Sequence, residues 1–363
     1  MGTGTGRGRV KAAREDGNTP RPAPRTGQSD GGSRESNMEL LRSMLLQRRF
    51  EERTAEAYAM GRIGGFCHLY IGQEAVSTGT ISTLRDDDYI ITTYRDHGQA
   101  LARGMSARSI MAELFGKIDG CSRGKGGSMH LFDRNLNFLG GHGIVGAHVA
   151  VGTGVAFAIK YRGGDQVCIC FMGESVVNTG AFHEALNMAG LWKLPIVYII
   201  ENNRYGMGTA LERASAIHDI YERGAAYNIA RTQCDGQDVF AVQKTVREAV
   251  DRARKDSLPT LLEARTYRFM GHSMSDAVSG TYRTKAELEE WQKRDPIVLL
   301  RMHMQEQGEL TEEALQKLDE ELKAEVQDAI DFAEKSPEPP PEALHEDVLV
   351  DTTSDATNEG GSG

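Results

Sequence analysis

Short apolar runs alternate with longer amphipathic stretches through the middle of this chain. The continuous apolar runs at residues 167–172 and 196–200 predict buried strands, and residues 178–193 between them are long enough for one helix. A strand–helix–strand unit with the usual right-handed crossover has parallel strands, whose carboxyl ends meet at one edge of the sheet. The pattern therefore predicts a parallel sheet with helices packed on it.

The rest of the ordered chain extends this alternation. Further strands are predicted at residues 88–94 and 259–269, and helices at 36–61, 106–116, 147–161 and 237–255. Loops are predicted at 116–146, which is rich in glycine, and at 270–282, and two or three surface helices within 284–334. These elements predict an α/β fold with a doubly wound, mostly parallel sheet flanked by helices. The expected organisation is a disordered segment at 1–36, one domain at 37–340 and a tail at 341–363 that is mobile at its end.

Composition and charge exclude several classes of partner. The net charge of the 363 residues is −10, without a concentrated basic stripe, which argues against nucleic-acid and membrane-surface binding. No apolar run approaches the roughly 18 residues that span a bilayer. The five cysteines lack metal-ligand spacing and indicate reduced thiols in a compartment of the cytoplasmic type. The Arg-rich leader keeps the mitochondrial matrix as an alternative, although its acidic residues and lack of an amphipathic stripe argue against a transit peptide.

Polar side chains follow the two central predicted strands where each strand ends. Glu174 follows the first strand and Asn203 follows the second, so parallel pairing brings them to the same edge of the sheet. A carboxylate, an amide oxygen and a nearby carbonyl suit Mg²⁺, and a helix beginning just after Ser175 suits phosphate. A metal beside a phosphate site implies a bound diphosphate.

The two motifs, GES at 173–175 and ENNRYG at 201–206, resemble the thiamine diphosphate motif, whose usual form is GDG followed by NN about thirty residues later. From about residue 38 to 340 the chain resembles the E1 alpha subunits of thiamine diphosphate-dependent 2-oxo acid dehydrogenases, most of all those of pyruvate dehydrogenase. Further matching segments are GFCHLYIGQEA, TTYRDHG, GKGGSMH, GGHGIVGA and RFMGHSMSD.

The resemblance implies a role for individual residues at matching positions. The implied metal ligands are Glu174, Asn203 and the carbonyl of Tyr205. The implied diphosphate contacts are Tyr94, Arg95 and Arg268, together with the backbone of Gly173, Ser175 and Val176. Gly143 and Val145 match positions whose backbone meets the aminopyrimidine ring, and His68 and His272 match positions near the reacting carbon, where a pKa near neutrality would allow proton transfer.

Two positions depart from the family motif. The metal-binding aspartate is replaced by Glu174, whose extra methylene requires the strand end or the ion to shift, because Mg²⁺ demands near-octahedral oxygens. The second glycine is replaced by Ser175, which matters little unless the backbone there needs a positive φ.

The resemblance predicts the alpha subunit of pyruvate dehydrogenase E1, which acts on a small 2-oxo acid. The partners would be a beta subunit in an α2β2 assembly and the dihydrolipoyl acetyltransferase E2, since no second GDG-like half is present in the chain. Acetoin and branched-chain 2-oxo acid dehydrogenases remain alternatives, as does a catalytically silent scaffold subunit. Residues 141–146 also spell GxGxxG, but we reject dinucleotide binding because 136–140 does not resemble a strand.

Overall fold

A six-stranded sheet runs through the computed structural model, which describes residues 34–276, 278, 280–346 and 348. The strand order is β2-β1-β3-β4-β8-β7, and every neighbouring pair is parallel. The strands are β1 (Tyr89–Thr93), β2 (Phe138–His142), β3 (Cys168–Gly173), β4 (Ile196–Asn202), β7 (Ala230–Asp235) and β8 (Thr260–Arg265). A short antiparallel hairpin, β5 (Tyr205–Gly206) with β6 (Thr209–Ala210), follows β4. The predicted fold class is confirmed.

The central strands are buried on both faces, which explains their unbroken apolar sequences. In β3, Cys168, Cys170 and Met172 join one hydrophobic cluster. Ile169 and Phe171 alternate with them and join another cluster on the opposite face. Because side chains alternate along a strand, the helices on the two sides of the sheet pack on different halves of one apolar segment.

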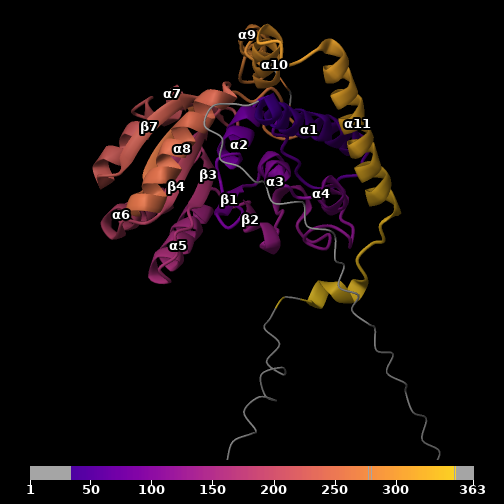
Figure 1. Ribbon diagram of the computed structural model, residues 1–363. Helices are drawn as coiled ribbons and strands as arrows, with labels where there is room; N and C mark the ends of the chain where they lie inside the picture. The colour runs from indigo at the N-terminus through magenta and orange to yellow at the C-terminus, as the bar shows by residue number, and fades with distance from the viewer. Residues whose placement is uncertain (1–33, 277, 279, 347, 349–363) are drawn as a thin grey trace, which may run out of the picture.

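Helices cover both faces of the sheet (Figure 1). One face carries α5 (Ala147–Tyr161), α6 (Gly180–Trp192) and the 3-10 segment η4 (Ile220–Tyr227). The other carries α2 (Glu74–Ile81), α3 (His97–Arg103) and α8 (Val239–Asp256). This is the doubly wound arrangement that the alternating pattern predicted.

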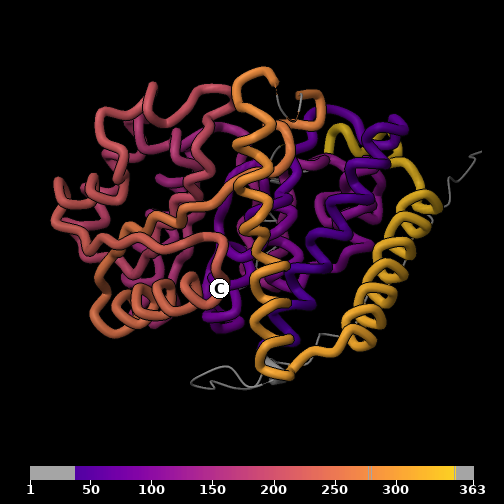
Figure 2. The backbone as a smooth tube through the Cα atoms, turned by 90° about the horizontal axis from the view of Figure 1, so that it is seen from above, coloured from indigo at the N-terminus to yellow at the C-terminus, as the bar shows by residue number. Residues whose placement is uncertain are grey.

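An outer layer of helices lies beyond α2 and α3. It contains α1 (Arg34–Ala59), α4 (Ala107–Leu114), α9 (Lys285–Gln292), α10 (Pro296–Glu306) and α11 (Glu312–Lys335). Figure 2 shows α11 running along the outer side of the N-terminal helices, and α11 packs against both α1 and α4. The C-terminal third of the described chain therefore closes over the N-terminal third, which buries a third hydrophobic cluster among α1, α10 and α11.

Three expectations from the sequence need correction. Residues 136–140 were rejected as a strand, but β2 occupies Phe138–His142, where two glycines hide the strand signal. The helix expected just after Ser175 is a 3-10 segment, η3 (Glu174–Asn178), and α6 begins only at Gly180. The strand expected at 259–269 ends at Arg265, so Arg268 lies three residues beyond it. The pattern also missed α2, α3 and β7, which are short and lack a clear period.

Two further expectations, about the segments 284–334 and 270–282, are confirmed for the described residues. Residues 284–334 form three helices, and the loop at 270–282 contains no helix or strand among its described residues. Residues 1–33 and 349–363, on which most of the predicted disordered segment and tail fall, lie outside the described residues. No helix of the described chain is both long enough and apolar enough to cross a membrane.

Candidate active site

The predicted site residues gather at the carboxyl edge of the sheet. The chain leaves β1 toward β2 on one side, whereas β3 and β4 lie on the other, so strand order reverses between β1 and β3. Crevices at such switch points are the usual ligand sites of open α/β sheets. Tyr94 and Arg95 follow β1, Glu174 follows β3, and Asn203 follows β4. The sheet therefore brings these residues of distant segments to one place.

The three predicted metal ligands lie around Arg268. Nη1 of Arg268 donates to Oδ1 of Asn203 at 3.2 Å and to the carbonyl of Tyr205 at 3.4 Å, so both oxygens point at one cationic position. Oε1 of Gln73 accepts from Nδ2 of Asn203 at 3.2 Å, which orients the amide oxygen inward. The Glu174 carboxyl is buried; burial raises its pKa, while Arg268 acts to lower it. Three oxygen-bearing groups, those of Glu174, Asn203 and Tyr205, thus surround a position that a cation already occupies.

No cluster of three or more His, Cys, Asp or Glu side chains in the described chain is arranged to hold a metal ion. The predicted set contains one carboxylate, one amide oxygen and one carbonyl, and these are the ligands of a hard cation that keeps other oxygens from water or phosphate. The residues present therefore fit Mg²⁺ held jointly with a diphosphate, and they do not form an all-protein metal cage.

Two buried arginines lie side by side without carboxylate partners. Arg95 donates to the carbonyl of Leu69 at 2.6 Å and to that of His272 at 2.8 Å. Burial, together with the nearby Arg268, lowers its pKa to about 10. Arg268 contacts carbonyls, the Asn203 amide and the hydroxyl of Tyr282, and within the described residues neither arginine forms an ion pair. Two buried and unneutralised guanidinium groups favour a polyanion such as a diphosphate.

His68, Tyr94 and His272 form one aromatic cluster. The His68 ring centroid lies 4.5 Å from that of Tyr94 and 5.2 Å from that of His272. Burial, reinforced by Arg95, lowers the pKa of His68 to about 2 and that of His272 to about 4. The expectation of pKa values near neutrality is therefore wrong for this state of the protein. At neutral pH both rings are uncharged, and the Nδ1 atom of each is buried with no hydrogen-bond partner among the described residues.

The loop after β2 holds Gly143 and Val145, the predicted aminopyrimidine contacts. A Cβ added at Gly143 would lie 3.3 Å from Cε1 of His130, so the backbone there is closely approached by a neighbouring ring. Val145 is half exposed, as expected for a group that faces a ligand or a partner. Dinucleotide binding was rejected because no strand was expected before this GxGxxG. The structure has a strand there, β2, and a helix after it, α5, so that reason does not hold. The strand after α5 is not adjacent to β2, however, so no consecutive βαβ unit is formed.

The turn after β3 supplies the predicted backbone contacts of Gly173, Ser175 and Val176. Ser175 is absent from the described residues with positive φ, so serine meets no conformational penalty where the family has glycine. The turn has a 3-10 form and lies at the carboxyl end of β3.

Several buried residues of the site were missed by sequence analysis. Glu201, at the end of β4, accepts from the hydroxyl of Tyr70 and from Nε2 of Gln99, and burial raises its pKa to about 7. Arg283 donates to the carbonyls of Arg268, Met270 and Val278, which fastens the loop that carries His272. Glu201 could have been recognised in the sequence as a charged residue at the end of an apolar strand. The sequence offers no comparable signal for Arg283, because it follows an irregular segment.

The fold and this site define a dehydrogenase E1 subunit. The model of the dehydrogenase E1 component family matches residues 42–342, and the chain belongs to that family. The chain is 50% identical over 319 residues to the pyruvate dehydrogenase E1 component subunit alpha of Rhizobium meliloti, covering 88% of this chain and 91% of the relative.

Other relatives carry the same description. The corresponding subunit of Rickettsia bellii is 45% identical over 317 residues, which cover 87% of this chain and 97% of the relative. A chloroplastic alpha-3 subunit of rice is 44% identical over 338 residues, which cover 91% of this chain and 79% of the relative. Membership of the dehydrogenase E1 family implies thiamine diphosphate as the cofactor, in agreement with the resemblance drawn from the motifs.

Proposed function

We propose that this chain is the alpha subunit of a pyruvate dehydrogenase E1 that binds thiamine diphosphate with Mg²⁺. With a beta subunit it would decarboxylate pyruvate oxidatively and acetylate the lipoyl group of a dihydrolipoyl acetyltransferase reductively. The single observation that carries the proposal is a pair of buried arginines, Arg95 and Arg268, which have no carboxylate partner in the described part of the chain and lie beside the converging oxygens of Asn203 and Tyr205. The names of the relatives support pyruvate as the substrate.

The residues divide the work of holding the cofactor. Glu174, Asn203 and the Tyr205 carbonyl would hold Mg²⁺, and Arg95 and Arg268 would neutralise the diphosphate, with Tyr94 as a hydroxyl donor. Thiamine diphosphate, when bound, supplies a nucleophilic carbon and an electron sink. Arg268 would then exchange its contacts with the Asn203 and Tyr205 oxygens for phosphate oxygens, since the metal requires those oxygens itself.

His68 and His272 would act on the substrate as neutral groups. Each ring has an unpaired Nδ1, and their centroids lie 5.2 Å apart, close enough to contact one small molecule together. A neutral imidazole can donate one hydrogen bond and accept another, which suits a ketone oxygen and a carboxylate. Their low pKa values indicate that neither ring is a cation before an anion binds, and a bound diphosphate or carboxylate would raise both values.

Activity with a partner subunit tests the proposal. The chain, co-purified with its beta subunit and supplied with thiamine diphosphate and Mg²⁺, would be offered pyruvate, 2-oxoisovalerate and acetoin separately, and reduction of an artificial electron acceptor followed. We expect activity with pyruvate above all. A preference for either other compound would retain the family and change the substrate, and silence with all three would favour the scaffold alternative.

The variant Glu174→Asp distinguishes a working site from a silent scaffold. Aspartate restores the shorter arm of the family motif, so in a working site the Mg²⁺ concentration at half-maximal activity should fall severalfold. A scaffold would show no activity with either residue. The matched control is Glu306→Asp, an exposed acid on α10 whose replacement should leave the Mg²⁺ requirement unchanged.

A further inference from the structure

The structure around Glu174 contains one group that the usual glycine at position 175 would not supply. Oγ of Ser175 donates to Oε1 of Glu174 at 3.3 Å. The Glu174 carboxyl is 3% exposed and forms no ion pair among the described residues. Among the described residues, the Ser175 hydroxyl is therefore the one side-chain group that donates a hydrogen bond to this buried carboxylate.

Gly206 is adapted to that serine by its lack of a side chain. A Cβ added at Gly206 would lie 1.9 Å from Oγ of Ser175 and 3.1 Å from its Cβ. It would also come within 3.7 Å of Oε1 of Glu174. Real Cβ atoms do not approach other atoms so closely, so a side chain at position 206 would force the Ser175 hydroxyl to turn away from Glu174 and would still press on the Ser175 Cβ.

Space, not backbone conformation, requires this glycine. Gly206 is absent from the described glycines with positive φ, so alanine could adopt its backbone conformation without strain. The hydroxyl of Ser175 occupies the volume that a side chain at 206 would fill. Alanine should therefore be tolerated at position 206 when position 175 is glycine, but not while Ser175 is present.

The contact bears on the predicted metal ligands because of its place in the chain. Gly206 follows Tyr205, whose carbonyl is one predicted ligand, and Ser175 follows Glu174, which is another. Both Tyr205 and Gly206 pair with the strand β6, and the segment η3 packs against β5. A shift of Gly206 away from Ser175 would therefore displace the Tyr205 carbonyl.

We propose that Ser175 and Gly206 are a matched pair of positioning residues that set the Glu174 carboxylate and the Tyr205 carbonyl for one divalent cation. The proposal rests on the proposed function in that the cation is the one bound with thiamine diphosphate. The serine hydroxyl directs the longer glutamate arm, and the bare glycine leaves room for the serine. The pair thus offsets part of the effect that the departure of GES from the family motif has on the metal ligands.

A double-mutant cycle tests the pair on the alpha–beta complex. The variants are Gly206→Ala, Ser175→Gly and both together, and the matched control is Gly180→Ala, where an added Cβ meets only the end of Glu184 at 3.7 Å. Isothermal titration calorimetry would measure the affinity for thiamine diphosphate at fixed Mg²⁺ and at fixed Mn²⁺. Thermal unfolding without ligands would be measured on the same samples.

We expect Gly206→Ala to weaken cofactor binding at least tenfold, which corresponds to about 1.4 kcal/mol. Ser175→Gly should weaken binding about threefold, and the double variant should match Ser175→Gly, because the obstacle to alanine is then gone. Additive effects in the cycle, or wild-type binding by Gly206→Ala, would overturn the proposal.

Thermal unfolding separates this proposal from the proposed function. If the wild-type complex binds no thiamine diphosphate, the proposed function fails, but the pair still predicts a lower Tm for Gly206→Ala that the second substitution restores. If Gly206→Ala alone yields no soluble complex, recovery of soluble complex in the double variant supports the pair. Failure of the double variant to recover, while Ser175→Gly folds normally, contradicts it.

Discussion

At the scale of single residues, burial decides how the histidines of this protein behave. His68, His148 and His272 all have pKa values lowered by burial, to about 2, about 4 and about 4. His68 and His272 lie against buried arginines, whereas His148 is a buried residue in the first turn of α5 and donates from Nε2 to the carbonyl of Phe171 at 2.8 Å. An anionic ligand would therefore favour the protonated forms of His68 and His272. His148 is a structural group whose protonation at acid pH would lower the free energy of unfolding.

Replacing either site histidine should lower turnover more than cofactor binding. For His272→Ala and His68→Ala we expect kcat with pyruvate to fall by about 10²- to 10⁴-fold, the range for a lost proton-transferring or polarising group. Steady-state kinetics and calorimetric titration with thiamine diphosphate would separate the two effects. The control His345→Ala lies in an exposed segment near the end of the described chain and should change neither quantity. A loss of less than threefold in kcat would contradict the assignment.

The low pKa of His148 predicts that the free energy of unfolding falls when the solution is acidified. Its folded-state pKa of about 4 lies below the ordinary value of 6.5, so the unfolded chain binds the extra proton first as the pH falls. The stabilising effect of the neutral ring is complete above pH 6.5 and is lost on acidification toward the folded-state pKa. Between pH 7 and pH 5 the variant His148→Gln should lose about 1–2 kcal/mol less unfolding free energy than the wild type. Urea unfolding at the two pH values checks this, and equal losses would refute it.

At the scale of elements, one buried carboxylate organises the glycine-rich loop after α4. Oε2 of Glu113 accepts from the N–H groups of Ser122 and Gly124, and Oε1 accepts from those of Gly126 and Gly127, over distances of 2.7–3.1 Å. Beyond this loop, Nδ1 of His130 lies 3.0 Å from the carbonyl of Gly141, at the end of β2. A segment without periodic sequence is thus held in place by hydrogen bonds to one side chain, and it leads to the Gly143 backbone.

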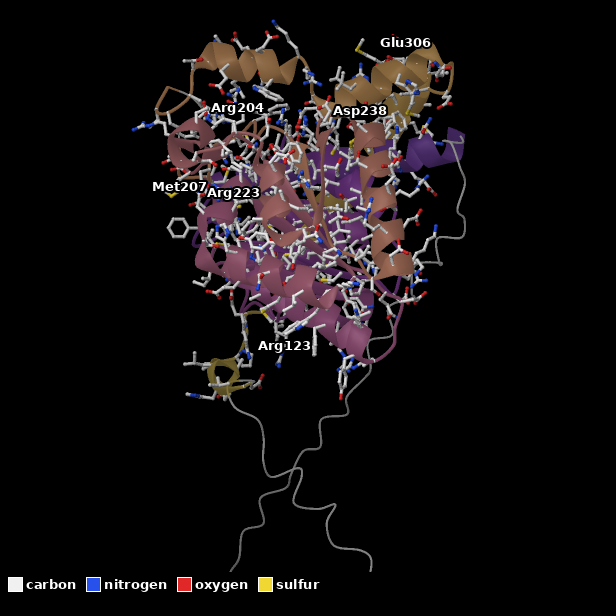
Figure 3. All side chains as sticks on the ribbon, turned by 90° about the vertical axis from the view of Figure 1, so that its left-hand side faces the viewer. Arg123, Arg204, Met207, Arg223, Asp238 and Glu306 are labelled. Atoms are coloured by element: carbon white, nitrogen blue, oxygen red, sulfur yellow. The ribbon has the colours of Figure 1, made fainter. Side chains whose placement is uncertain are left out.

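Glu113→Gln should destabilise the protein far beyond an ordinary surface change. The amide cannot accept at both ends, so two of the four partly buried N–H groups lose their partner, at a cost of about 1–3 kcal/mol in unfolding free energy. Chemical denaturation would measure the loss. Glu306→Gln is a suitable control, because Figure 3 shows Glu306 at the periphery of the molecule and its replacement should change stability by less than about 0.5 kcal/mol. Equal stability of the two variants would show that the loop does not depend on Glu113.

At the scale of the whole molecule, an apolar surface remains exposed on α5 and α6, which lie side by side on one face of the sheet (Figure 1). The ring centroids of Phe157 and Trp192 lie 5.3 Å apart, and Tyr161 and Leu191 beside them are 83% and 71% exposed. Contiguous exposed aromatic and aliphatic groups of this kind mark protein–protein interfaces. This surface is the expected contact for another subunit of the E1 assembly.

A charge in this surface should block assembly without unfolding the chain. For Leu191→Glu we expect the association with a beta subunit to weaken at least a hundredfold, because a carboxylate would be buried without a partner. The Tm of the alpha chain alone should stay within about 2 °C, since the side chain is exposed there. Sedimentation velocity of mixed subunits measures the first quantity, and Met302→Glu, in an exposed position of α10, is the control. Unchanged assembly would place the interface elsewhere.

Much of this architecture could be predicted because apolar runs and helical periodicity are visible in short stretches of the sequence. The buried strands at 167–172 and 196–200 and the helices at 147–161 and 237–255 lie within about two residues of β3, β4, α5 and α8. The elements that were missed share a physical cause. In β2 the glycines remove the side chains that signal a strand, and α2 and α3 are only two turns long and are stabilised by burial more than by propensity.

The sequence by itself determined the α/β class and the family, and it predicted the positions proposed to bear the chemistry, because strand period, motif order and residue type depend on neighbours along the chain. Only the tertiary structure decided the state of those groups. The low pKa values of His68 and His272, the absence of carboxylate partners for Arg95 and Arg268 in the described chain, and the fit of Ser175 against Gly206 all depend on segments far apart in sequence. Burial and charge at a site are sums over everything packed around it, and that packing exists only once the chain is folded.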